Sequence, residues 1–153
     1  METFRDQTET WEINNRVNIY LLDETEEDWL DDRIMDKGRS VFENFAHIHN
    51  VRLMWLKEAA PALMNAVVKI ENNEGRDSLK ANLNKSSLAI VQLLEKGFSE
   101  NKIKGFKPHP SAFLGYLIAH EAHHRGHIMQ CLKINGHLKS KSLGFALWQW
   151  GTR

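Results

Sequence analysis

The sequence has a single cysteine, Cys131, so it cannot form an intrachain disulfide. A chain without disulfides suits a reducing compartment, and we expect a cytoplasmic protein. No apolar run approaches the length of a membrane-spanning helix, and the N-terminal segment lacks the basic and apolar regions of a signal peptide. We therefore expect a soluble protein without a membrane partner.

The sequence also lacks an excess of either charge, because 20 Lys and Arg residues balance 20 Asp and Glu residues. No net field would draw the chain to nucleic acid, and no segment has the clustered basic residues of a recognition helix, so we expect no nucleic-acid partner. The charges are unevenly placed, since residues 1–36 are rich in acidic side chains and none follows Glu121. We expect this asymmetry to help the two ends of the chain dock.

Signals for β-strands are missing, and apolar residues recur at helical spacing throughout. A chain of 153 residues with 42% hydrophobic content can build one core, so we expect a single domain over residues 1–153. The pattern predicts four helices and a short amphipathic C-terminal segment, at residues 8–24, 40–60, 79–98, 110–136 and 140–150. The predicted fold class is all-α, a four-helix bundle, in which cofactor sites are built from inward-facing side chains of different helices.

Several residues predict where these helices begin and end. Thr8 or Thr10 is expected to cap the first helix, and Ser40 with Glu43 three places on forms the pattern of a capping box for the second. Pro61 lies beyond the second helix, and Pro110 is expected to open the fourth.

Four histidines lie within nine residues of the fourth predicted helix, in the stretch "AHEAHHRGH". At about 100° per residue, His120 and His124 lie about 40° apart and one turn from each other, so they can share an ion. His123 and His127 crowd the same side of the helix and are expected to line the site, not to ligate. The same side carries four further residues that place it in the bundle interior, namely Phe113, Tyr116, Leu117 and Cys131.

A histidine pair alone more often lies on a surface or in a hydrogen-bonded core, so a metal site needs a third ligand from another helix. The second helix offers His47 and His49, about 200° apart, and only one of them can face the fourth helix. We favour His47 because it shares a side with Val51 and Met54, which we assign, with Ala46 and Trp55, to the inward face. Three neutral imidazoles with an open position suit Zn²⁺, Ni²⁺ or Fe²⁺. Cys131 is expected to be a small buried packing residue.

The string His120-Glu121-x-x-His124 also satisfies the zinc-protease pattern, in which the glutamate is the general base. No acidic residue follows to supply the third ligand of one protease class, and His127 and Gln130 stand where the other class needs Gly and His. We therefore interpret the match as accidental. Glu121 is expected about 100° away from His120, at a helix edge, as a solvated or salt-bridged charge.

The chain resembles the DinB-like superfamily of bacterial four-helix metal proteins. The resemblance rests on "AHIHNVRLMWL" in the second helix, "GYLIAHEAHHRGHIMQCLKINGH" in the fourth and "ALWQW" in the tail, and its most specific part is the pattern HxxxHRGxI. It implies an up-down-down-up bundle, often a homodimer, whose divalent ion is held by His47, His120 and His124. His127 departs from the pattern, since many members have Gln there.

The histidine site and the resemblance together leave two kinds of function open. The first is a metal-dependent enzyme acting on a small molecule, either an S-transferase that uses a low-molecular-weight thiol such as bacillithiol or mycothiol, or a hydrolase. The alternative is a non-catalytic, stress-associated dimer with a structural ion. A third interpretation, an interaction module built on the tail around Trp148 and Trp150, is weaker because such a tail more often covers a core or a dimer interface.

Overall fold

The computed structural model describes residues 3–138 and 140–153, and in these residues it contains helices and no strand beyond an isolated bridge. The four long helices are α1 (Arg5–Asp23), α2 (Val41–Ala59), α3 (Arg76–Glu100) and α4 (Pro110–Ile134). The short ones are α5 (Ser142–Ala146) and the 3₁₀ helices Glu27–Asp31, Pro61–Ala66 and Trp150–Thr152. The predicted all-α fold class is therefore confirmed.

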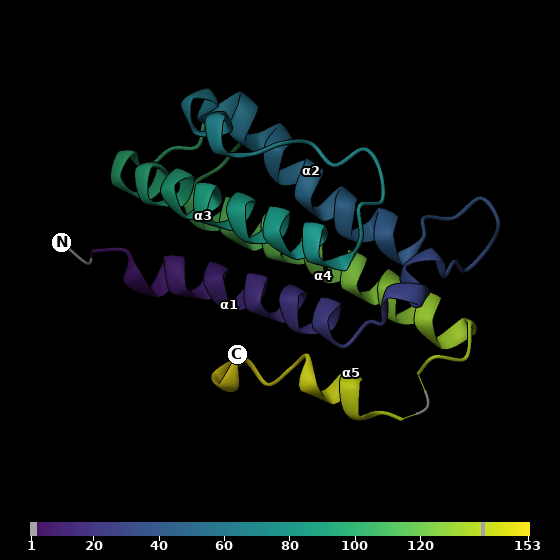
Figure 1. The fold of residues 1–153 in the computed structure, drawn as a ribbon. Coiled ribbons are helices and arrows are strands. Elements are labelled where there is room, and N and C mark those ends of the chain that lie inside the picture. Colours follow the sequence, from purple (N-terminus) through teal and green to yellow (C-terminus); the bar gives the residue numbers. More distant parts are fainter. Residues whose placement is uncertain (1–2, 139) are drawn as a thin grey trace.

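The four long helices run up, down, down and up, and they form one bundle (Figure 1). α1 and α2 each pack against both α3 and α4. The parallel pair α2 and α3 requires a connection that returns along the bundle, and residues 60–75 supply it. α5 runs back beside α1, and at the end of this tail the Arg153 guanidinium lies 3.9 Å from the ring centre of Tyr20. The C-terminal segment thus contacts α1 through Tyr20, and that contact does not involve an acidic side chain.

Local signals account for most of the helix boundaries. Ser40 Oγ accepts from the backbone N–H of Glu43 at 3.1 Å, and the Glu43 carboxylate accepts from the Ser40 N–H at 2.8 Å, so the predicted capping box is confirmed. α4 begins with Pro110 at its first turn and ends just before Gly136, whose φ of +79° favours glycine. The predicted caps of α1 are wrong. That helix begins at Arg5, and the hydroxyls of Thr8 and Thr10 donate to backbone carbonyls one turn earlier.

The core of the bundle has two apolar halves separated by a polar layer. One half gathers around Trp11, Leu56 and Phe113, and the other around Leu21, Phe45 and Ile128. All four long helices contribute to the layer between them, with buried polar side chains at Asn14, Asn18, His49, Arg52, Ser86, Glu121 and Arg125. A buried polar group is costly unless it is hydrogen-bonded, and each of these side chains has a hydrogen-bond partner within the layer.

The predicted inward faces of α2 and α4 need correction. Met54 is 53% exposed and Tyr116 is 37% exposed, although both were assigned to the interior. The buried side of α2 instead includes His49 and Arg52. An inward face predicted from the spacing of apolar residues leaves such polar side chains out. Phe113, Leu117 and Cys131 are buried as predicted, and Tyr116 lies at the edge of an aromatic cluster with Trp55, Phe106 and Phe113.

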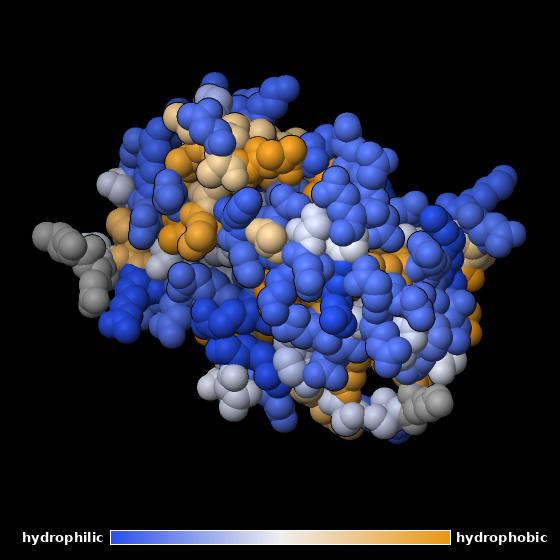
Figure 2. Space-filling view, viewed as in Figure 1, coloured by the Kyte–Doolittle hydropathy of each residue, from blue (hydrophilic) through white to orange (hydrophobic). Residues whose placement is uncertain are grey.

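The surface shown in Figure 2 is mainly hydrophilic, with separate apolar patches instead of a continuous apolar face. Among the described residues, no helix combines the length and the apolar character that crossing a membrane would require.

Candidate metal centre

Three imidazole rings meet where α2 faces α4, at the height of the polar layer. They belong to His47, His120 and His124, and one ring nitrogen from each lies within 4.8 Å of the others. The Nε2 atoms of His47 and His120 are 3.3 Å apart, and the ring of His47 lies 4.5 Å from that of His124. His120 and His124 are one helical turn apart, and their ring centres are 4.7 Å apart. The structure thus brings the three predicted residues together.

The ring of His124 is held by a hydrogen bond on the side away from the cluster. Its Nδ1 lies 3.0 Å from Asn44 Oδ1, and the Asn44 side-chain amide donates to the carbonyl of Ser40 at 2.9 Å. Because the amide nitrogen of Asn44 is used in this way, its oxygen faces His124 and accepts the Nδ1 proton. His124 Nε2 is then the unprotonated nitrogen, and it is available to a ligand within the cluster.

The electrostatics favour uncharged imidazoles. The pKa of His124 is lowered to about 3, first by burial and then by the neighbouring His120 and His47. Burial also lowers the pKa of His47, and Arg39 adds to this effect. Burial lowers the pKa of His120 as well, although the Glu121 carboxylate opposes it. All three rings are therefore neutral near pH 7, the form in which imidazole binds a metal.

The spacing of the cluster fits a divalent ion. In a tetrahedral site with metal–nitrogen bonds of about 2.0–2.1 Å, ligand nitrogens lie about 3.3 Å apart. The two Nε2 atoms of His47 and His120 have this separation. Three imidazoles leave at least one coordination position for water or substrate, so the cluster could hold a divalent metal ion with an open position.

The other histidines take different places. His123 and His127 are exposed neighbours of the cluster, with ring centres 4.3 Å apart. His49 lies on the opposite side of α2 from His47 and is fully buried, where its ring contacts Ser86 Oγ at 3.0 Å and the carbonyl of Val68 at 2.7 Å. These contacts use both ring nitrogens, so His49 is a hydrogen-bonded core residue. Cys131 is also fully buried, as predicted.

Glu121 is not at a solvated helix edge, contrary to the prediction. It is 1% exposed and forms an ion pair with Arg52, whose Nε lies 2.6 Å from Oε1. Its Oε2 accepts from Arg52 Nη2 and from the amides of Asn14 and Asn18. Burial raises the pKa of this carboxyl, but the Arg52 charge and the hydrogen bonds outweigh burial, and the pKa stays below its ordinary value. A carboxylate turned into the core and held in this way cannot serve as the base of a protease, so the His-Glu-x-x-His match is accidental.

A pocket of about 230 Å³ adjoins the cluster on the side of His124. It is lined by Arg39, Asn44, His127 and Cys131 together with the apolar residues Ile34 and Met35. The Arg39 guanidinium makes no hydrogen bond or ion pair among the described residues, and its charge lowers the pKa of all three clustered histidines. On the side of His120, the ring of Tyr116 stacks on the imidazole with ring centres 6.4 Å apart.

Two residues of this site were missed in the sequence, Asn44 and Arg39. A signal for Asn44 was present, because it precedes His47 by three residues and so lies on the same side of α2. Arg39 lies in the connection before α2, and the helical spacing of apolar residues does not predict where a side chain outside a helix points.

A comparison with models of protein families matches residues 1–143 to the DinB family. The comparisons with curated proteins and with solved structures found no match. The family match spans the whole bundle and both helices that carry the three histidines.

Proposed function

The chain belongs to the DinB family, and from this premise we propose that it is a metal-dependent enzyme acting on a small molecule. Its ligands would be His47, His120 and His124, and its ion Zn²⁺ or Ni²⁺, with Fe²⁺ as a third candidate. The reaction we propose is the transfer of a low-molecular-weight thiol to an electrophile. Hydrolysis at the same site is the second candidate reaction.

One observation carries this proposal, namely that three histidine nitrogens lie within 4.8 Å of one another and that a pocket opens beside Asn44, the hydrogen-bond partner of His124. A structural site uses all of its coordination positions for protein ligands, whereas a catalytic one keeps a position open. His47, His120 and His124 supply only three ligands, and the pocket beside His124 has room for a small substrate.

The residues around the cluster have separable roles in this proposal. Asn44 fixes the tautomer of His124 through the 3.0 Å contact to Nδ1. Arg39 presents an unpartnered cation at the pocket, which favours a substrate with an anionic group such as a thiolate or a carboxylate. Tyr116 and the aromatic cluster behind it would contribute a partly apolar wall on the side of His120. A bound divalent ion would lower the pKa of a thiol or water bound to it, so that this group could lose its proton near neutral pH.

The experiment is a turnover assay with protein purified without a nickel column and then loaded with Zn²⁺, Ni²⁺ or Fe²⁺. The substrates are a set of low-molecular-weight thiols and a chlorinated aromatic electrophile. We expect metal-dependent loss of the thiol, which chelation abolishes. His47→Ala and His120→Ala should lose both metal stoichiometry and turnover, because each removes one of three ligands.

The matched control is His123→Gln, which changes an exposed histidine next to the cluster. It should keep metal stoichiometry and most of the turnover. Full turnover in His47→Ala and His120→Ala would contradict the proposed site. A large fall in melting temperature on chelation, without turnover for any thiol or for hydrolysis, would indicate a structural ion in its place.

A further inference from the structure

Arg125 lies on the far side of α4 from the metal centre, about 140° around the helix from His120. It is 7% exposed, and its Nη1 donates to Asn14 Oδ1 at 2.9 Å and to Asn18 Oδ1 at 2.7 Å. These partners are neutral amides. Among the described residues, no carboxylate lies within ion-pair distance of Arg125, because both oxygens of Glu121 are taken up by Arg52 and the two asparagines.

The polar layer therefore contains more positive than negative charge. Arg52 and Arg125 are both buried, and Glu121 is the buried carboxylate beside them. Arg52 uses its Nε, Nη1 and Nη2 in hydrogen bonds, whereas Nε and Nη2 of Arg125 have no hydrogen-bond partner in the part of the chain that is described. Among the described residues, only Trp55 Nε1 is a side-chain N or O atom that is both buried from solvent and without a hydrogen-bond partner. Nε and Nη2 of Arg125 are therefore not fully buried. The free edge of the Arg125 guanidinium is thus accessible.

That edge borders a pocket of about 320 Å³ between α4 and the C-terminal tail. Its walls are apolar, with Ile118 and Met129 on α4 and Leu147, Trp148 and Trp150 on the tail. Pockets for small ligands have volumes from about 300 Å³ upward, apolar walls and a few polar groups that fix orientation. Arg125 is the only charged residue among those that line this pocket.

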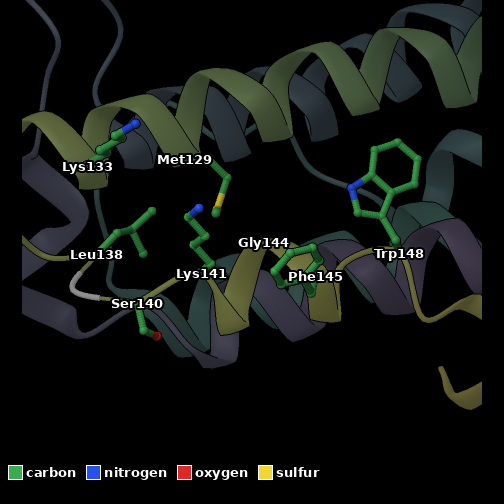
Figure 3. A pocket seen from close by; sticks show the side chains of 8 residues that line it. All are labelled: Met129, Lys133, Leu138, Ser140, Lys141, Gly144, Phe145 and Trp148. Carbon is green, nitrogen blue, oxygen red and sulfur yellow. The ribbon is translucent and has the colours of Figure 1, made fainter.

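A second pocket of about 520 Å³ adjoins the first and shares Met129, Gly144 and Trp148 with it. Figure 3 shows Lys133 on α4 and Lys141 on the tail at this pocket, with the side chain of Met129 extending from α4 toward the tail. Every charged residue that lines either pocket is a cation, in agreement with the lack of acidic residues after Glu121. The groove formed by the two pockets, which we call the tail groove, therefore favours an anion.

We propose that the tail groove binds an apolar monocarboxylate, whose carboxylate accepts hydrogen bonds from Nε and Nη2 of Arg125. Its aromatic or aliphatic body would lie between Met129, Leu147 and Trp148. The charge of the ligand would complete the polar layer, because it supplies the anion that Arg125 lacks. This site is independent of the metal centre, which lies on the opposite side of α4.

The test uses the full chain in the presence of a chelator, so that a carboxylate cannot bind at the metal centre. The probe is 1-naphthoate. Its binding is measured by calorimetry and by the change in tryptophan fluorescence, to which Trp148 and Trp150 contribute. We expect it to bind at least about tenfold more tightly than 1-naphthamide, which has the same body without the charge. Arg125→Met should remove this preference.

Arg125→Met also disturbs the polar layer, so a second variant addresses the pocket alone. A Cβ added at Gly126, which lines the pocket, meets no atom within 4 Å, so Gly126→Leu fills the pocket without straining the backbone. We expect it to weaken 1-naphthoate binding about tenfold or more. The matched control is Gly115→Leu on the same helix, outside both pockets and equally free of contacts, which should bind like the unaltered chain.

Equal affinity for the acid and the amide would overturn the proposal, as would full binding in Gly126→Leu. Light scattering distinguishes another occupant. If the chain is a dimer that Trp148→Ser dissociates, and 1-naphthoate does not bind, then a second copy of the chain covers the groove and the proposal is wrong.

Discussion

Replacing Glu121 by Gln tests whether the polar layer depends on one buried charge. The carboxylate accepts two hydrogen bonds from Arg52, at 2.6 and 2.9 Å, and one each from Asn14 and Asn18, both at 2.7 Å. Gln has the same shape but no charge, and its NH₂ group would face N–H groups that now donate hydrogen bonds to the carboxylate. It would leave Arg52, which is fully buried, without a counter-ion.

Breaking a buried ion pair by removing one partner costs about 3–5 kcal/mol. Since domains are commonly stable by only about 5–15 kcal/mol, we expect Glu121→Gln to lose about a fifth or more of the unfolding free energy. Urea unfolding followed by circular dichroism measures this loss. The matched control is Glu95→Gln, an exposed residue of α3, which should change the unfolding free energy by about 0.5 kcal/mol or less.

The double variant Arg52→Met with Glu121→Leu provides a second check. It removes both charges of the pair, so it should be less destabilised than the sum of its single variants. A loss below about 1 kcal/mol in Glu121→Gln, or strict additivity in the double variant, would refute the reasoning, because the charge would then not be compensating Arg52.

Three further predictions concern the metal centre and the start of α2. Asn44→Ala should weaken Zn²⁺ binding about 10- to 100-fold in calorimetry, because the His124 tautomer is no longer fixed, while the exposed control Asn65→Ala should not change it. Ser40→Ala removes the capping box and should cost about 0.5–2 kcal/mol in urea unfolding, and an unchanged midpoint would count against the cap. The pKa of His124 is lowered from its ordinary value of 6.5 to about 3 in the folded metal-free chain. Below pH 6.5 this histidine therefore binds a proton more readily in the unfolded chain than in the folded one. The unfolding free energy should therefore fall as the pH drops from 6.5 toward 3, and His124→Gln should show a shallower fall.

The four long helices could be read from the sequence because their signals are local. Ser40 and Glu43 lie within one turn, Pro110 opens α4 and Gly136 follows its end, so each boundary depends on residues a few positions apart. Thr8 and Thr10 show the limit of this reasoning. Both are good cap residues, but α1 continues to Arg5 and places them inside the helix.

The three clustered histidines were also within reach of the sequence, although the argument for His47 was partly wrong. The one-turn spacing of His120 and His124 places them on one side of any α-helix. The choice of His47 over His49 relied on Met54 being buried, and it is exposed. His47 nevertheless faces α4, because His49 turns into the core toward Ser86 of α3.

By itself, the sequence determined the helices, the capping box and the pair of histidines one turn apart, because backbone hydrogen bonds and side-chain caps act over three or four residues. Only the tertiary structure decided that Glu121 is a buried counter-ion, that Asn44 orients His124, and that Arg125 borders a pocket under the tail. Each of these depends on which helices meet and at what rotation. At this level the inward faces of α2 and α4 carry the charged side chains of Arg52, Glu121 and Arg125, which a hydrophobicity pattern treats as surface.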